Sequence, residues 1–305
     1  MTAISTPVMP TDFPALLKKH GLAAVRDRGQ HFLFDEKILN KIVEAAGVRA
    51  GDAVLEIGPG PGALTMALLG RGARVLAVEL DRRFAPFYAE LFPGRTCEIR
   101  WGNILDFSNA NLAKALAGGG EPVPRSSCPA KLQRSGVGEG GWRLVANLPY
   151  GLTARILEKF ITEEPWPRSL TVMVQREVAD RILAGSGRMS ALAVMVQTFG
   201  RPRRVINVPR GAFRPPPRVD SAVVHIEVKP TAEREKFFAA TTPEKYFALV
   251  RTAFSSPRKK ISNTLAALVP AESWTAAVIS PDCRPERLMP EDWRRLAVAC
   301  GKRAA

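Results

Sequence analysis

The chain has 305 residues, 46% of them hydrophobic and 24% charged, which is enough apolar material for a sizeable core. Lys and Arg outnumber Asp and Glu by 44 to 29, and the net charge of +15 favours a polyanionic partner, either nucleic acid or an anionic membrane surface. The four cysteines form no CxxC pair, which argues against a zinc motif or a disulfide framework, so we expect no metal. The absence of a long apolar run and of a signal-like N-terminus predicts a cytoplasmic protein.

Short apolar strands alternate with helical patterns up to about residue 228. A first helix is predicted over residues 38–46, with Asp35 as its N-cap. The predicted strands are Ala53–Ile57, Arg74–Val78, Glu98–Trp101, Arg143–Ala146, Leu170–Val174 and Ala222–Val228. Helical patterns between them include Phe84–Leu91, Thr153–Ile161 and Glu177–Leu183. This alternation predicts βαβ units, and therefore an α/β fold whose parallel sheet is covered on both faces.

The strand signal ends near Pro230, and three helical stripes follow it. They run from Tyr246 to Phe254, through Ile261, Leu265 and Leu268, and onward from Pro290. We therefore predict an N-terminal extension (1–28), a Rossmann-like domain (29–228) and a small all-helical domain (229–305). The Gly- and Pro-rich stretch 117–141 cannot bury enough apolar surface to offset its ordering entropy, and we predict a flexible insertion there.

A glycine-rich bend, Gly58–Gly62, follows the first predicted strand and opens a helix at Ala63. Glycines at such a bend let the backbone approach a ligand and present free N–H groups to it. Glu79 ends the next strand, where a carboxylate can accept hydrogen bonds from both hydroxyls of a ribose. The pattern predicts a site for S-adenosylmethionine or for a dinucleotide. Glu56, two residues before the bend, favours S-adenosylmethionine because it suits a charged amino-acid moiety.

The tetrapeptide Asn147-Leu148-Pro149-Tyr150 follows the fourth predicted strand. The exocyclic amine of adenine is a poor nucleophile because its lone pair is delocalised into the ring. The side-chain oxygen of Asn147 and the backbone carbonyl of Leu148 can accept the amine protons and localise that pair as charge develops. Pro149 fixes the backbone, and Tyr150 offers a ring on which an extruded base can stack. An ordinary Asn-x-Pro turn is the alternative.

Two basic clusters are candidate RNA contacts. Six arginines surround Phe213, so phosphate-binding groups flank the predicted base pocket: Arg201, Arg203, Arg204, Arg210, Arg214 and Arg218. A second cluster, Arg258, Lys259 and Lys260, is predicted to begin a helix in the small domain. A solvated surface is the alternative interpretation of both clusters.

Seven stretches together resemble the KsgA/RsmA family of small-subunit rRNA adenine N6,N6-dimethyltransferases. They are GQHFL (29–33), EIGPGPGALT (56–65), VELD (78–81), NLPY (147–150), QREVADRILAG (175–185), AFRPPPRVDSAVV (212–224) and TAFSSPRKKISNTL (252–265). The resemblance implies a class I methyltransferase that uses S-adenosyl-L-methionine. It implies dimethylation of two adjacent adenosines in a hairpin loop near the 3′ end of small-subunit (16S-type) rRNA. We expect a monomer that acts on a precursor small ribosomal subunit, without a membrane.

The resemblance also implies roles for individual residues. His31 and Leu33 would line the methionine end of the cofactor, above Gly58 and Gly60, and Glu79 would hold the ribose. Asn147 would touch both the cofactor and the target amine. Phe213 would clamp the extruded base against Tyr150. Asn103 would lie beside the cofactor's adenine, where the family usually has Asp, so we expect weaker cofactor binding.

Three other functions stay open on the sequence. A large-subunit rRNA adenine methylase of the antibiotic-resistance type has similar NLPY chemistry, but the stretches at 212–224 and 252–265 argue against it. A ribosome-assembly checkpoint would bind immature subunits, with methylation secondary. A dehydrogenase would explain the glycine-rich bend but not NLPY.

Overall fold

The computed structural model describes residues 13–24, 30–92, 97–118 and 141–301. Contacts between residues divide the chain into two compact units, Met1–Ala179 with Arg203–Val228, and Asp180–Pro202 with Lys229–Ala305. The second unit thus includes residues 180–202, which the sequence-based boundaries assign to the methyltransferase domain. Those boundaries stay a prediction. The predicted insertion 117–141 lies almost entirely outside the described residues.

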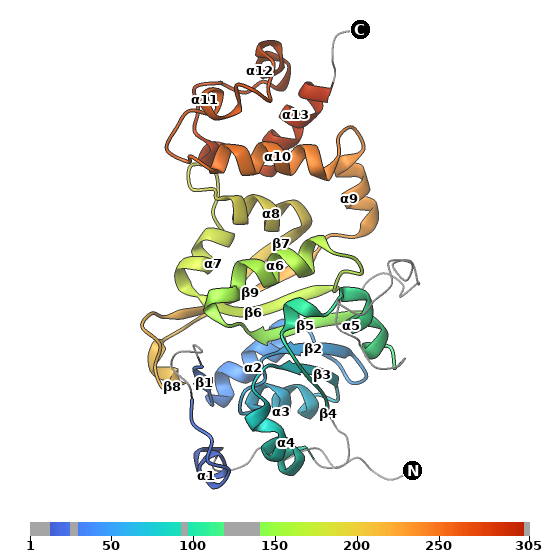
Figure 1. Ribbon diagram of the computed structural model, residues 1–305, viewed down its shortest axis with the longest axis vertical. Coiled ribbons are helices and arrows are strands. Elements are labelled where there is room, and N and C mark those ends of the chain that lie inside the picture. Colours follow the sequence, from blue (N-terminus) through green and yellow to red (C-terminus); the bar gives the residue numbers. More distant parts are fainter. Residues whose placement is uncertain (1–12, 25–29, 93–96, 119–140, 302–305) are drawn as a thin grey trace. The chain divides into compact units, whose positions relative to one another are not determined.

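The first unit alternates strands and helices along the chain (Figure 1). Its strands are β1 (Phe32–Leu33), β2 (Ala53–Ile57), β3 (Arg74–Glu79), β4 (Cys97–Trp101), β5 (Trp142–Asn147), β6 (Ser169–Gln175), β8 (Phe213–Arg214) and β9 (Ser221–Val228). Its helices are α1 (Phe13–Lys19), α2 (Glu36–Ala45), α3 (Ala63–Gly70), α4 (Ala85–Leu91), α5 (Asn109–Leu116) and α6 (Thr153–Thr162). Helix α7 (Arg176–Ile182) and strand β7 (Gly200–Val208) run across the division between the units. The six predicted strands are thereby confirmed, and Asp35 caps α2 through the backbone N–H groups of Lys37 and Ile38.

Among the described residues the main sheet has seven strands in the order β4-β3-β2-β5-β6-β9-β7. The pairs from β4 to β6 are parallel, as predicted. Strand β9 pairs with β6 in the antiparallel direction, with Ser221 opposite Gln175, so the prediction of a wholly parallel sheet is wrong. Because β9 runs in reverse, its first residue lies at the edge where the parallel strands end.

The sheet is buried on both faces. Val54, Val75 and Val145 belong to one hydrophobic core together with side chains of the helices α1 to α4. The alternate residues Leu55 and Leu144 are also fully buried but lie outside that core. Successive side chains of a strand point to opposite faces, so both faces of the sheet are covered.

Strand β7 was not predicted, because Arg201, Arg203 and Arg204 break the apolar pattern that marks a strand. Strand β7 is the last strand in the order and therefore an edge strand of the sheet, and its side chains are mostly half-buried or exposed. Charged side chains on an edge strand disfavour pairing with another sheet. These arginines thus have a structural explanation that the sequence did not indicate.

Apart from the first residues of β7, the second unit is helical within the described residues. Its helices are α8 (Ala191–Phe199), α9 (Thr231–Phe238), α10 (Pro243–Phe254), α11 (Ile261–Leu265), α12 (Ala271–Ala277) and α13 (Pro290–Gly301). Its core contains Tyr246 and Trp293, both fully buried, and the Tyr246 hydroxyl lies 2.8 Å from that of Thr198. Helix α11 begins at Ile261, so the prediction that Arg258 begins a helix is wrong. Residues 258–260 instead join α10 to α11.

Candidate active site

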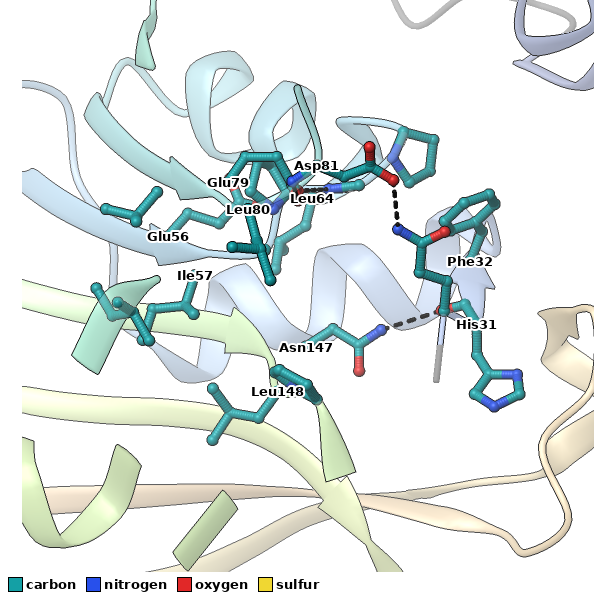
Figure 2. A pocket seen from close by; sticks show the side chains of 18 of the residues that line it. His31, Phe32, Glu56, Ile57, Leu64, Glu79, Leu80, Asp81, Asn147 and Leu148 are labelled. Carbon is teal, nitrogen blue, oxygen red and sulfur yellow. Dashed lines mark hydrogen bonds between the residues drawn. The ribbon is translucent and has the colours of Figure 1, made fainter. Parts of the chain in front are cut away.

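A pocket lies where β2, β3 and β5 end, and residues just before and within β1 form part of its wall (Figure 2). Its lining includes the predicted residues His31, Leu33, Gly58, Gly60, Glu79, Asn103, Asn147, Leu148, Pro149 and Tyr150. The carboxyl ends of parallel strands meet at one edge of a sheet, and ligands of open α/β sheets bind there. The fold therefore brings together residues that are more than a hundred positions apart in the sequence.

The glycine-rich bend turns directly after β2. Gly58, Gly60 and Gly62 have φ angles of 64°, 54° and 80°, a region that favours glycine. A Cβ on Gly62 would lie 2.8 Å from the Leu91 side chain, so close packing also requires glycine there. A Cβ on Gly58 would meet no heavy atom within 4 Å, so its backbone faces open space beside the pocket.

Glu79, the last residue of β3, is buried and hydrogen-bonded. One carboxylate oxygen accepts the Asp81 N–H at 2.8 Å and the other accepts the Gly60 N–H at 3.2 Å. Burial raises the pKa of Glu79 above its usual value. The side chain is thereby held between the bend and the end of β3, which suits an acceptor for two hydroxyl groups.

Glu56 is a second buried carboxyl group in the pocket wall, 1% exposed. It accepts a hydrogen bond from the Thr65 hydroxyl at 2.6 Å. Desolvation is the main cause that raises its pKa to about 8, and the negative charge of Glu79 adds to the shift. The described lining residues include Glu56, Glu79 and Asp81 but neither Lys nor Arg. A lining whose described residues include three carboxyl groups and neither Lys nor Arg fits a cationic ligand such as S-adenosylmethionine, whose positive charge would favour the ionised form of Glu56 over the protonated form that results from burial.

Asn147 ends β5, and its side-chain nitrogen donates to the backbone carbonyl of His31 at 3.3 Å. Figure 2 shows the amide oxygen pointing away from that carbonyl. The backbone N–H of Leu148 donates to Met173 in β6, so the residue after Asn147 is tied to the sheet. Asn147 thus presents a side-chain acceptor that its own hydrogen bond does not use.

Tyr150 is half-buried in the pocket wall, and its ring stacks near that of His31 with centroids 6.0 Å apart and an interplanar angle of 24°. His31 also hydrogen-bonds to the Pro215 carbonyl at 2.9 Å. Burial raises the pKa of the Tyr150 phenol, so Tyr150 is neutral near pH 7.

Phe213 does not lie in the pocket wall. It is fully buried in the core, in β8, and pairs with Leu33 of β1. The predicted clamp on a base would require its side chain to leave that core. The aromatic ring beside Tyr150 in the structure is that of His31, a residue that the sequence assigned only to the cofactor.

Asn103 lies at the start of a short helical turn (Ile104–Asp106), and its side-chain oxygen accepts the Leu105 N–H at 3.1 Å. Sequence reasoning missed two apolar lining residues nearby. Leu80 is 64% exposed although it lines the pocket, whereas Ile104 is buried. An exposed leucine in a pocket indicates a surface that an apolar ring can cover.

The predicted RNA-binding residues are exposed. Arg210, Arg214 and Arg218 belong to the segment between β7 and β9 that also carries β8. In the second unit Arg258 and Lys259 are exposed, but Lys260 is 3.0 Å from Asp282 and so part of its charge is compensated.

No group of His, Cys, Asp or Glu suitable for a metal occurs among the residues that the structure describes. Within the same residues no helix is long and apolar enough to cross a membrane.

Comparison with solved structures agrees with this geometry. The crystal structure of the 23S rRNA methyltransferase ErmE covers 89% of this chain, and 100% of the ErmE chain is covered in turn. The TM-score is 0.64 and the sequence identity is 27%. A dimethyladenosine transferase from Plasmodium falciparum covers 87% of this chain and is itself covered to 96%, with a TM-score of 0.65 and 25% identity. The fold and the pocket define a class I methyltransferase that uses S-adenosylmethionine.

Sequence comparison narrows this class. The profile of the family "Ribosomal RNA adenine dimethylase" matches residues 23–298, and the chain belongs to that family. A protein of Phenylobacterium zucineum named ribosomal RNA small subunit methyltransferase A is 40% identical over 93% of this chain and 90% of its own length. A protein of the same name from Novosphingobium aromaticivorans is 36% identical over 94% of this chain and 98% of its own length.

Proposed function

We propose that the chain dimethylates the exocyclic amines of two adjacent adenosines in a hairpin loop near the 3′ end of small-subunit rRNA. The substrate is a precursor of the small ribosomal subunit, and the enzyme acts as a cytoplasmic monomer. The names of its sequence relatives support the small subunit. The fold does not separate this function from methylation of large-subunit rRNA, because ErmE is as similar in structure as the Plasmodium enzyme.

The observation that carries the catalytic proposal is the hydrogen bond from Asn147 to the His31 carbonyl. With its nitrogen engaged there, the amide of Asn147 offers its oxygen to the target amine. The Leu148 carbonyl is the second acceptor, and the two acceptors localise the nitrogen lone pair as positive charge develops on the amine. Tyr150 stacks on the base.

S-adenosylmethionine supplies an electrophilic methyl group when it is bound. Glu79 would hold its ribose, the apolar side chains of Leu80 and Ile104 would contact its adenine, and Glu56 would interact with its cationic end. After methyl transfer the nitrogen carries a positive charge and is a far stronger acid, so its proton passes to solvent water and no strong general base is needed. Arg210, Arg214, Arg218, Arg258, Lys259 and Lys260 contact phosphates of the RNA.

Both proposed acceptors, the Asn147 side-chain oxygen and the Leu148 carbonyl, belong to residues of the pocket lining, which favours catalysis over a checkpoint role that needs only binding. The test is a mass-spectrometric map of adenosine methylation in rRNA from cells with and without the protein, complemented by wild type or by Asn147→Ala. Loss of dimethyladenosine from small-subunit rRNA alone is expected. Loss from large-subunit rRNA would contradict the proposal.

A single-turnover assay on isolated small subunits separates chemistry from binding. Asn147→Ala should lower the rate on the order of a hundredfold or more at saturating RNA, because one transition-state hydrogen bond is lost. Asn207→Ala removes an amide from strand β7, outside the pocket lining, and should leave the rate unchanged. Recovery of the Asn147→Ala rate at saturating RNA would mean that Asn147 only positions substrate.

A further inference from the structure

The hydroxyl group of Tyr150 has a buried partner. Its oxygen lies 2.6 Å from the side-chain oxygen of Ser221, and Ser221 is completely buried. Ser221 is the first residue of β9, more than seventy positions away from the tetrapeptide that contains Tyr150. Neither the pocket lining nor the proposed mechanism gives Ser221 a role.

Ser221 is held rigidly at the pocket edge of the sheet. It pairs with Gln175 at the end of β6. The preceding residue, Asp220, accepts the Arg176 N–H through its carbonyl and the Arg210 N–H through its side chain, at 3.0 and 3.1 Å. The Ser221 hydroxyl therefore has a fixed position relative to β6 and β5.

Tyr150 has no comparable backbone support. It lies outside the sheet, in a short helical turn that begins after Pro149, and its ring is only half-buried. A tyrosine side chain rotates about two torsions. The bond to Ser221 restrains the far end of the ring, whereas the backbone fixes only its Cα end. The long axis of the ring is thus held at both ends, by the backbone through Cβ and by Ser221 through the hydroxyl group.

We infer that Ser221 is a positioning residue for methyl transfer, holding the ring of Tyr150 in the orientation that presents the target amine to Asn147. The inference rests on the proposed stacking role of Tyr150. Only two residues separate Asn147 from Tyr150, so the direction of the ring axis affects where a stacked base lies relative to the Asn147 oxygen. Small displacements of a reacting group, on the order of 1 Å, lower rates by large factors.

The test is a double-mutant cycle measured by single-turnover methylation at saturating S-adenosylmethionine. The RNA probe is small ribosomal subunits isolated from cells that lack this enzyme. Ser221→Ala and Tyr150→Phe each remove the same hydrogen bond, and each should lower the rate roughly tenfold, with the affinity for S-adenosylmethionine unchanged. The double variant should be no slower than either single variant. Ser221→Thr keeps the hydroxyl and should restore most of the rate.

The matched control is Thr171→Val. Thr171 is equally buried in the neighbouring strand β6, and its hydroxyl lies 2.8 Å from a side chain outside the pocket, His225. This variant should lower the melting temperature but not the rate. A similar loss of rate in Thr171→Val, or multiplication of the two effects in the double variant, would overturn the inference.

Two further variants keep the outcomes distinguishable. Tyr150→Phe leaves the buried strand intact, so an unchanged rate in this variant overturns the inference even if Ser221→Ala does not fold. Tyr150→Ala removes the ring itself. Full activity of Tyr150→Ala would refute the proposed stacking role, whereas an inactive Tyr150→Ala beside a fully active Ser221→Ala would refute only the role of Ser221.

Discussion

Glu79 joins two parts of the pocket wall. Its carboxylate accepts one backbone N–H from the glycine-rich bend, at Gly60, and one from Asp81 beyond β3. Each carboxylate oxygen has a second lone pair, so both can still accept a ribose hydroxyl. A single side chain is thereby bonded to the bend and placed where we propose that it binds the ribose of the cofactor.

Glu79→Ala should weaken the binding of S-adenosylmethionine by about 1–3 kcal/mol, the scale for lost hydrogen bonds to a charged acceptor. Part of this loss arises because the Gly60 N–H loses its acceptor. Isothermal titration calorimetry measures the effect. Glu98→Ala, an exposed carboxyl group on β4 outside the pocket lining, should bind the cofactor like wild type. Equal affinities for the Glu79 variant and wild type would show that Glu79 does not hold the ribose.

Helix α12 ends in a backbone motif that normally contains glycine. The N–H of Ile279 bonds to the carbonyl of Trp274, and that of Val278 bonds to that of Thr275, both at 3.0 Å, which is the Schellman pattern. Val278 therefore adopts a φ of 57°, and its side chain is 82% exposed. A β-branched residue is strained there and recovers little free energy from burial.

Val278→Gly should therefore raise the free energy of unfolding by about 1 kcal/mol, the difference between the cost of a left-handed valine and the chain entropy of glycine. Denaturant unfolding measures the change. Ala266→Gly is the matched control, since Ala266 follows α11 in the right-handed region and is exposed. It should destabilise the protein by about 0.5–1 kcal/mol. A destabilised Val278→Gly variant would show that the valine side chain makes a compensating contribution.

Stability of the whole molecule should depend on pH through buried groups with opposite effects. Glu56 has a pKa of about 8 when folded, against an ordinary value of 4.5, so only the folded state holds its proton between these values. The free energy of unfolding therefore falls as pH rises through that range. Burial and nearby positive charges lower the pKa of His225 from 6.5 to about 4, so stability rises with pH over that interval. The two effects oppose each other below pH 6.5.

Between pH 6.5 and about 8 the contribution of Glu56 is no longer opposed by His225. The cofactor-free protein should lose stability there, by at most about 1.4 kcal/mol per pH unit for each such carboxyl. Glu79, whose pKa is also raised, acts in the same direction at pH values above its ordinary pKa of 4.5. Glu56→Gln should flatten the decline, as measured by chemical denaturation at a series of pH values. A decline of the same slope in Glu56→Gln would mean that Glu56 is ionised in the folded protein.

We expect RNA binding to depend on individual phosphate contacts and not on the net charge of the protein alone. Arg258→Glu and Lys259→Glu should weaken binding to small subunits and lower the slope of log affinity against log salt by about one unit per lost phosphate contact, at constant magnesium. Lys236→Glu is a control of equal charge change on α9. A uniform loss of affinity in all three variants would indicate that net charge alone, and no local contact, controls binding. The catalytic rate at saturating RNA should stay near wild type.

Much of the site was predictable because its parts are local in the sequence. The strand–bend–helix around Gly58, the carboxylate at Glu79 and the tetrapeptide at Asn147 each follow an apolar strand, and parallel strands bring their carboxyl ends to one edge. The predicted strands are confirmed because a strand that is buried on both faces produces a continuous apolar run, which is also a local feature of the sequence. The arginine-rich β7 produced no such run and was missed.

The sequence by itself determined which residues end the strands and which chemistry they carry. Only the tertiary structure decided their neighbours. The reversed direction of β9 brings Ser221 to Tyr150. The pairing of β1 with β8 buries Phe213, and the ring beside Tyr150 is that of His31. Both outcomes depend on pairing between segments far apart in the chain. Such pairing is selected by the packing of the whole core, and no local pattern of residues encodes it.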